Sequence, residues 1–131
     1  MTTRHASCSC GRLNATTTGE PVRISICHCL DCQRRTGSPF DEQARFAASE
    51  VQIQGRSSSW TRTADSGNRI TFHFCPVCGA TVFYRPEKEP DLIAIPVGVF
   101  ADPSFPGPRV SVYESRRHPW VVVPDDLEHF D

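Results

Sequence analysis

The sequence has no long hydrophobic run and no excess of charge of one sign. No apolar segment approaches the roughly 20 residues of a membrane-spanning helix, so we expect no membrane partner. Residues Met1–Ala6 lack the apolar core of a secretory signal, which favours a cytoplasmic protein. The net charge is −1. Such a balance offers no basic field to neutralise phosphates, so we also expect no nucleic-acid partner.

Several sequence motifs that mark common enzyme classes are absent as well. There is no Gly-rich phosphate loop, no Gly-x-Ser-x-Gly elbow and no His-Glu-x-x-His helix. Nucleotide-binding enzymes, serine hydrolases and zincin proteases are therefore excluded. The chain also has no internal repeat and no low-complexity linker. At this length, we expect residues 1–131 to form a single domain.

Proline and glycine are frequent, with 11 and 8 residues, and they divide the chain into short segments. This spacing predicts a mainly β fold with at most one or two short helical turns. Only Asp31–Thr36 has a helical pattern, with Asp31 as the N-cap and Gly37 as the stop. The predicted strands are Arg12–Thr17, Val22–Cys27, Ala44–Ala47, Val51–Gln54, Ser58–Thr63, Arg69–Phe74, Thr81–Tyr84, Leu92–Val99 and Val110–Tyr113.

The seven cysteines form three tight clusters: Cys8 with Cys10, Cys27 with Cys29 and Cys32, and Cys75 with Cys78. Zinc sites take thiolates in short local groups that converge from separate segments, whereas disulfide frameworks spread cysteines along the chain. An odd count in a reducing cytosol also argues against disulfides. We therefore predict zinc as the cofactor.

Two ways of grouping these thiolates remain open. Cys8, Cys10, Cys75 and Cys78 can form a closed four-thiolate structural site. Cys27, Cys29 and Cys32 would then hold a second zinc whose fourth position is free, as a catalytic site requires. Alternatively, Cys29 and Cys32 can join Cys75 and Cys78 in a zinc ribbon, which leaves Cys8, Cys10 and Cys27 for the second site.

Residues near the middle cluster are candidates for substrate binding. Arg34 and Arg35 follow the last thiolate in the predicted helix, where they can bind a carboxylate or form only a solvated basic face. Phe40 and Trp120 can line a cleft or belong to the core. His28 lies between two ligands of an extended segment, so its side chain points away from them as a polar neighbour.

The full pattern of motifs resembles the glutathione-dependent formaldehyde-activating enzymes, a family that includes centromere protein V-like members. The resemblance rests on Cys8-x-Cys10-Gly11, Cys27-His28-Cys29-x-x-Cys32, Thr36-Gly37-Ser38, Phe74-Cys75-x-x-Cys78-Gly79, Val97-Gly98 and Pro119-Trp120. It implies a zinc-bound tent of antiparallel β-sheets. It also implies that Cys8, Cys10, Cys75 and Cys78 bind the structural zinc, and Cys27, Cys29 and Cys32 the catalytic one.

The resemblance further implies a carbon–sulfur lyase activity of the S-hydroxymethylglutathione synthase type. In that reaction glutathione, or a related thiol, condenses with formaldehyde or a similar small carbonyl. The alternative is a non-catalytic zinc module that binds a small thiol or a protein partner, and a homo-oligomer is compatible with either function. Many relatives carry a histidine at the position of Ser111, and this difference bears on the substrate.

Overall fold

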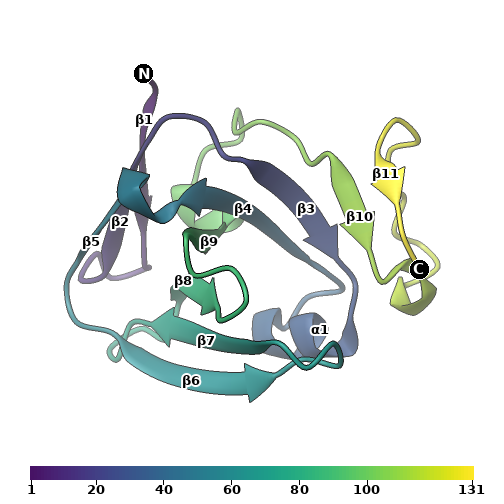
Figure 1. Ribbon diagram of the computed structural model, residues 1–131, viewed down its shortest axis with the longest axis horizontal. Helices are drawn as coiled ribbons and strands as arrows, with labels where there is room; N and C mark the ends of the chain where they lie inside the picture. The colour runs from purple at the N-terminus through teal and green to yellow at the C-terminus, as the bar shows by residue number, and fades with distance from the viewer.

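Two β-sheets and one short helix make up the fold in the computed structural model, which describes residues 1–131 (Figure 1). The smaller sheet has the order β1-β2-β5 and the larger one the order β11-β10-β3-β4-β9-β8-β7-β6. The prediction of a mainly β fold is therefore confirmed. The strands are β1 (Thr3–Ser7), β2 (Asn14–Thr18), β3 (Arg23–Cys27), β4 (Asp41–Ala47), β5 (Val51–Gln54), β6 (Ser58–Thr63), β7 (Arg69–Phe74), β8 (Thr81–Pro86), β9 (Leu92–Pro96), β10 (Val110–Val112) and β11 (Glu128–His129).

The remaining elements are helical and short. They are the α-helix α1 (Leu30–Thr36) and the 3₁₀ turns η1 (Ala48–Glu50), η2 (Val97–Phe100) and η3 (Glu114–Arg116). The N-cap of α1 is Cys29 rather than the predicted Asp31, because the Cys29 sulfur accepts a hydrogen bond from the Cys32 amide. Gly37 ends the helix in the left-handed conformation, as predicted.

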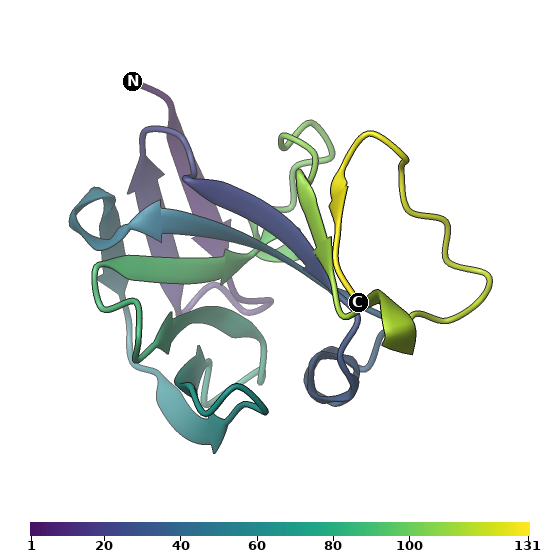
Figure 2. The same ribbon diagram turned by 45° about the vertical axis from the view of Figure 1, so that its right-hand side comes forward.

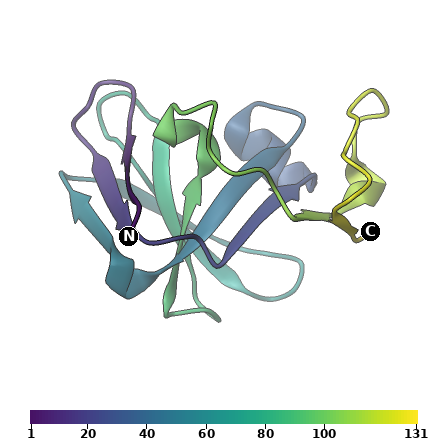
Figure 3. The same cartoon turned by 90° about the horizontal axis from the view of Figure 1, so that it is seen from above.

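The main hydrophobic core lies between the two sheets. Its fully buried side chains include Leu13 near β2, Phe46 on β4, Val82 on β8 and Ile95 on β9. A smaller cluster of Phe72, Tyr84 and Ala94 lies further along the large sheet. The small sheet and the C-terminal segment lie at opposite ends of the molecule (Figure 3). The main core therefore lies against the middle strands of the large sheet, β3, β4, β9 and β8.

Several strand boundaries differ from the predictions. Strand β4 begins at Asp41, whereas the sequence predicted a start at Ala44. The prediction was too short because Asp41 and Gln43 are polar but buried, so they do not show the apolar alternation of a strand. The strand predicted to reach Val99 ends at Pro96, which has no amide hydrogen to continue the ladder, and η2 follows. Strands β1 and β11 were not predicted.

One end of the large sheet departs from the expected antiparallel arrangement. Strand β10 pairs in parallel with β3, and β11 pairs in parallel with β10. This pairing brings the C-terminal segment beside the end of β3, where Cys27 lies. Figure 2 shows α1 between that segment and strands β6 and β7. No helix has both the length and the apolar character needed to cross a bilayer.

Candidate metal centres and the adjoining cavity

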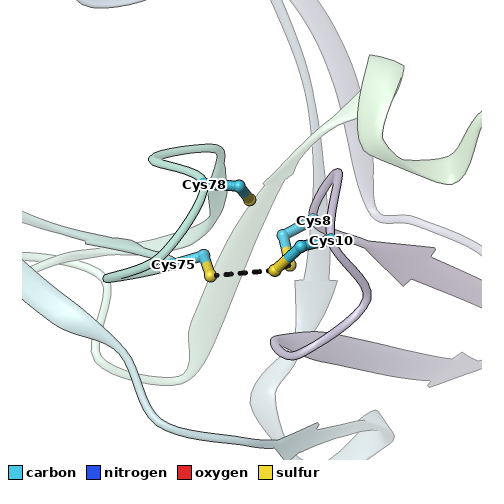
Figure 4. A group of neighbouring side chains, drawn as sticks. All are labelled: Cys8, Cys10, Cys75 and Cys78. Atoms are coloured by element: carbon cyan, nitrogen blue, oxygen red, sulfur yellow. Dashed lines mark hydrogen bonds between the residues drawn. The ribbon is translucent and has the colours of Figure 1, made fainter.

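The first thiol cluster joins two loops that are far apart in the sequence. Cys8 and Cys10 lie in the β1–β2 connection, and Cys75 and Cys78 lie in the β7–β8 connection. All four sulfurs lie within 4.8 Å of one another and point toward a common centre (Figure 4). The Cys8 and Cys10 sulfurs are 3.7 Å apart, and those of Cys10 and Cys75 are 3.6 Å apart.

This geometry fits a tetrahedral zinc ion. Zn–S bonds of about 2.3 Å require sulfur–sulfur separations of about 3.8 Å, close to both measured values. Backbone amides also point at the sulfurs, from Leu13 to Cys8 at 3.2 Å and from Val77 to Cys75 at 3.4 Å. Hydrogen bonds from the amides of Ala80 and Cys10 lower the pKa of Cys78 to about 6, which favours the thiolate that zinc binds.

The second cluster is built from one continuous segment. Cys27 ends β3, Cys29 caps α1 and Cys32 lies in its first turn, so the strand-to-helix corner brings the three sulfurs within 4.8 Å of one another. The two clusters share no residue, so the sulfurs are not grouped as the zinc-ribbon alternative requires. Neither cluster includes a histidine.

The three thiols of this second cluster have different pKa values when no cation is bound. Hydrogen bonds from the thiols of Cys27 and Cys32, together with the Cys32 amide, lower the pKa of Cys29 to about 2. The hydrogen bond with Cys29 helps to raise the pKa of Cys27 to about 11, and the pKa of Cys32 is raised through its hydrogen bonds with Cys27 and Cys29. Because like charges repel at this distance, a bound cation is needed to hold all three as thiolates. The donor set therefore fits zinc with one coordination position free.

A cavity of about 630 Å³ opens directly onto this three-thiol cluster. Its walls come from α1, from strands β4 and β6–β8, and from the C-terminal segment. Charged side chains of both signs line it: Asp31, Arg34, Asp41, Arg45, Arg62, Asp65, Arg116 and Asp131. The volume lies within the usual range for small-molecule sites. The four-thiol cluster contributes no residue to this cavity.

Most of the arginines in the cavity already have a carboxylate partner. Arg62 lies 3.0 Å from Asp31, and Arg45 lies 2.6 Å from Glu89. Arg34 lies 3.8 Å from Asp31, but its side chain is 79% exposed. Arg116 is exposed and makes no ion pair. Arg34 and Arg116 are therefore the guanidinium groups most free to bind an anionic ligand.

A buried polar network lies at the inner end of the cavity. The Asp41 carboxylate accepts a hydrogen bond from the Tyr84 hydroxyl at 3.1 Å and lies 2.9 Å from the Arg35 guanidinium. Burial and the negative charge of Asp41 raise the pKa of Tyr84 well above its usual value, so this phenol stays neutral. The network therefore places a neutral phenol, whose O–H is donated to Asp41, and a paired carboxylate in the wall of the cavity that contains the thiols.

The four residues predicted to bind substrate lie in different surroundings. Arg34 lines the cavity, whereas Arg35 points inward to Asp41. Phe40 and Trp120 do not line the cavity. Phe40 lies against the His28 ring, with 6.1 Å between ring centroids, and Trp120 is 69% exposed.

His28 is fully buried and contacts the C-terminal segment rather than a metal. Its Nε2 lies 2.9 Å from the Ser111 hydroxyl. The Gln33 side chain donates hydrogen bonds to the carbonyls of His28 at 2.8 Å and Arg116 at 3.1 Å, and its Oε1 lies 2.8 Å from His118. These contacts fix η3 against α1 and so define one wall of the cavity.

The cavity residues that sequence reasoning did not identify as site residues include Asp41, Arg62, Tyr84, Tyr113 and Arg116. Of these, only Asp41 adjoins a residue that was predicted to bind substrate, Phe40. The others are ordinary strand or turn residues in the sequence. Tyr113 has a positive φ of 57°, which turns the chain from β10 into η3 and brings Arg116 to the cavity.

Comparison with known proteins identifies the family of this chain. The family model described as glutathione-dependent formaldehyde-activating enzyme matches residues 3–116, which include all seven cysteines. The chain belongs to the glutathione-dependent formaldehyde-activating enzyme family. The predicted family is thus confirmed, and both thiol clusters and most of the cavity lie within the matched residues.

A solved structure supports the fold of this family member. The crystal structure of a Rhodobacter sphaeroides protein superposes with a TM-score of 0.57 at 18% sequence identity. The comparison covers 72% of this chain and 85% of that chain, and at such identity it concerns the fold alone. No curated protein matches the sequence.

Proposed function

We propose that the protein is a zinc-dependent carbon–sulfur lyase of the S-hydroxymethylglutathione synthase type. It would condense glutathione, or a related thiol, with formaldehyde or a similar small carbonyl. The observation that carries this proposal is the three-thiol cluster of Cys27, Cys29 and Cys32, which faces a cavity of about 630 Å³. Three protein ligands and an adjacent cavity leave room for a substrate atom at the metal.

In the proposed reaction, the thiol sulfur forms a bond to the carbonyl carbon while the carbon–oxygen π bond breaks. The thiol proton ends on the new hydroxyl group. When bound, zinc would supply a positive charge that lowers the pKa of a thiol and stabilises negative charge on oxygen. Cys8, Cys10, Cys75 and Cys78 would hold the structural zinc, and Cys27, Cys29 and Cys32 the catalytic one.

The other roles in this proposal belong to the cavity walls. Arg34 and Arg116 would bind carboxylates of the thiol substrate, because Arg34 is exposed with only a 3.8 Å contact to Asp31 and Arg116 makes no ion pair. Tyr84 and Asp41 would keep the inner wall polar and fixed, because each is hydrogen-bonded and buried. The thiol would therefore be oriented with its sulfur toward Cys27, Cys29 and Cys32.

Metal content tests the two proposed sites first. We expect two zinc ions per chain after purification under reducing conditions, and one in a folded variant with serine at Cys27, Cys29 and Cys32. One zinc in both proteins would leave only a structural site. Two zinc ions without thiol-dependent turnover would favour the alternative, a non-catalytic module that binds a small thiol or a protein partner.

Turnover then tests the catalytic roles. Cys32→Ser should remove glutathione-dependent consumption of formaldehyde while the protein stays folded, and full activity of this variant would refute the proposed site. Arg116→Gln should raise KM for the thiol about two- to fivefold with little change in kcat, the effect of losing one exposed ion pair. The matched control is Arg23→Gln, an exposed arginine at the opposite end of β3 from Cys27.

A further inference from the structure

A second hollow of about 620 Å³ adjoins the proposed active cavity. Asp31, Arg34, Arg62 and Phe72 line both hollows. The ion pair between Asp31 on α1 and Arg62 on β6, with 3.0 Å between charged atoms, stands at this shared boundary. Only side chains therefore separate the hollow from the cavity that contains the three-thiol cluster.

The floor of the second hollow is an aromatic platform. Trp60 on β6 pairs in register with Phe72 on β7, so both side chains lie on one face of the sheet. Their rings are inclined by 26° with 6.3 Å between centroids. Phe72 is buried, but Trp60 is 57% exposed. A planar ligand stacked on Trp60 would cover this large apolar surface, which water otherwise contacts.

The rim of the hollow carries more positive than negative charge. Arg34 and Arg62 both contact a single carboxylate, that of Asp31, at 3.8 and 3.0 Å. Arg35 also borders the hollow, but Asp41 neutralises it at 2.9 Å. One guanidinium charge, mainly that of the exposed Arg34, is therefore left without a counterion beside the aromatic platform.

We propose that this hollow is an extension of the active cavity that binds an aromatic group bearing a carboxylate. The ring stacks on Trp60, and the carboxylate pairs with Arg34 and with Arg62 at the boundary. The assignment of this group to the substrate rests on the proposed function, whereas the binding itself does not. One of the two substrates, the thiol or the carbonyl compound, would then carry the aromatic carboxylate.

The binding test uses the zinc-loaded protein and 2-naphthoate as the probe. The two indole N–H signals of the protein, assigned with Trp60→Phe, are followed by NMR during the titration. The Trp60 signal should shift to saturation while the Trp120 signal stays in place. The neutral analogue 2-naphthamide should bind about two- to fivefold more weakly, the effect of one exposed charge pair. Equal affinity for the acid and the amide, or no shift at Trp60, would overturn the proposal.

Matched variants and kinetics complete the test. Arg34→Gln should weaken 2-naphthoate binding about two- to fivefold, whereas Arg69→Gln, an exposed arginine on β7 outside the hollow, should not. Naphthoate should also inhibit turnover. Inhibition should compete with the thiol if the thiol carries the aromatic group, and with the carbonyl compound if the carbonyl compound carries it. Saturable binding without inhibition would refute the link to the active cavity. If no turnover exists at all, the proposed function fails, but the NMR result still decides the site.

Discussion

Replacement of Asp41 should show how much the buried network beside the thiols stabilises the fold. Asp41 is 3% exposed, and its partner Arg35 has a side chain that is 11% exposed. The Arg35 guanidinium also lies over the rings of Phe72 and Tyr84, at 5.0 and 5.3 Å from their centroids. Asp41→Asn keeps the shape and the acceptor for Tyr84 but leaves the buried cation without its counterion.

The size of the effect follows from that burial. Removing one partner of a buried ion pair costs about 3–5 kcal/mol, and we expect about 3 kcal/mol because asparagine still accepts the hydrogen bond from Tyr84. The unfolding entropy of a chain of this length is about 0.28 kcal/mol/K. The loss therefore corresponds to a decrease in Tm of about 11 °C.

A double-mutant cycle separates this charge effect from loss of packing. Arg35→Met removes the cation but keeps an apolar stem between the aromatic rings, so the double variant should recover about 2 kcal/mol of the loss. Tm and denaturant unfolding of the zinc-loaded proteins provide the measurement. Equal destabilisation of Asp41→Asn and the double variant would refute the reasoning, because the unpaired charge would then carry no cost.

Three further predictions follow from other contacts. The His129–Glu114 pair, 2.8 Å apart, raises the pKa of His129 through its hydrogen bond with Glu114, so its stabilisation is present below about pH 6 and lost as pH rises through the raised pKa. The difference in unfolding free energy between wild type and His129→Gln should thus be larger at pH 5.5 than at pH 9, and a difference independent of pH would contradict this. Gly55→Ala should destabilise the protein by about 2 kcal/mol or more in denaturant unfolding, because φ is +99° and a Cβ would lie 1.9 Å from the Arg12 carbonyl oxygen; unchanged stability would show that the turn relaxes. Cys10→Ser should lower zinc content by one ion per chain and lower Tm, whereas retention of both ions would exclude this sulfur as a ligand.

Local sequence patterns predicted much of the fold and identified all seven candidate ligands, but they did not decide how the ligands are grouped. Strand β7 has the predicted bounds, Arg69–Phe74, because its apolar residues alternate cleanly before Cys75. Strand β4 was predicted too short, because Asp41 and Gln43 are polar residues buried by the tertiary structure. Periodicity reports burial only where buried residues are apolar, so it failed at Asp41 and Gln43, which line the cavity.

The sequence by itself determined the chemistry available to this protein, since its seven cysteines lie in three short groups along the chain. It left open which clusters meet, because ligand spacing constrains only local geometry. The tertiary structure decided that Cys10 lies beside Cys75, 65 positions later in the chain, and that Cys27, Cys29 and Cys32 stand alone at a cavity. It also decided that parallel pairing of β10 with β3 brings Arg116 to that cavity. Such contacts depend on the packing of segments that are distant in sequence, so local sequence patterns do not predict them.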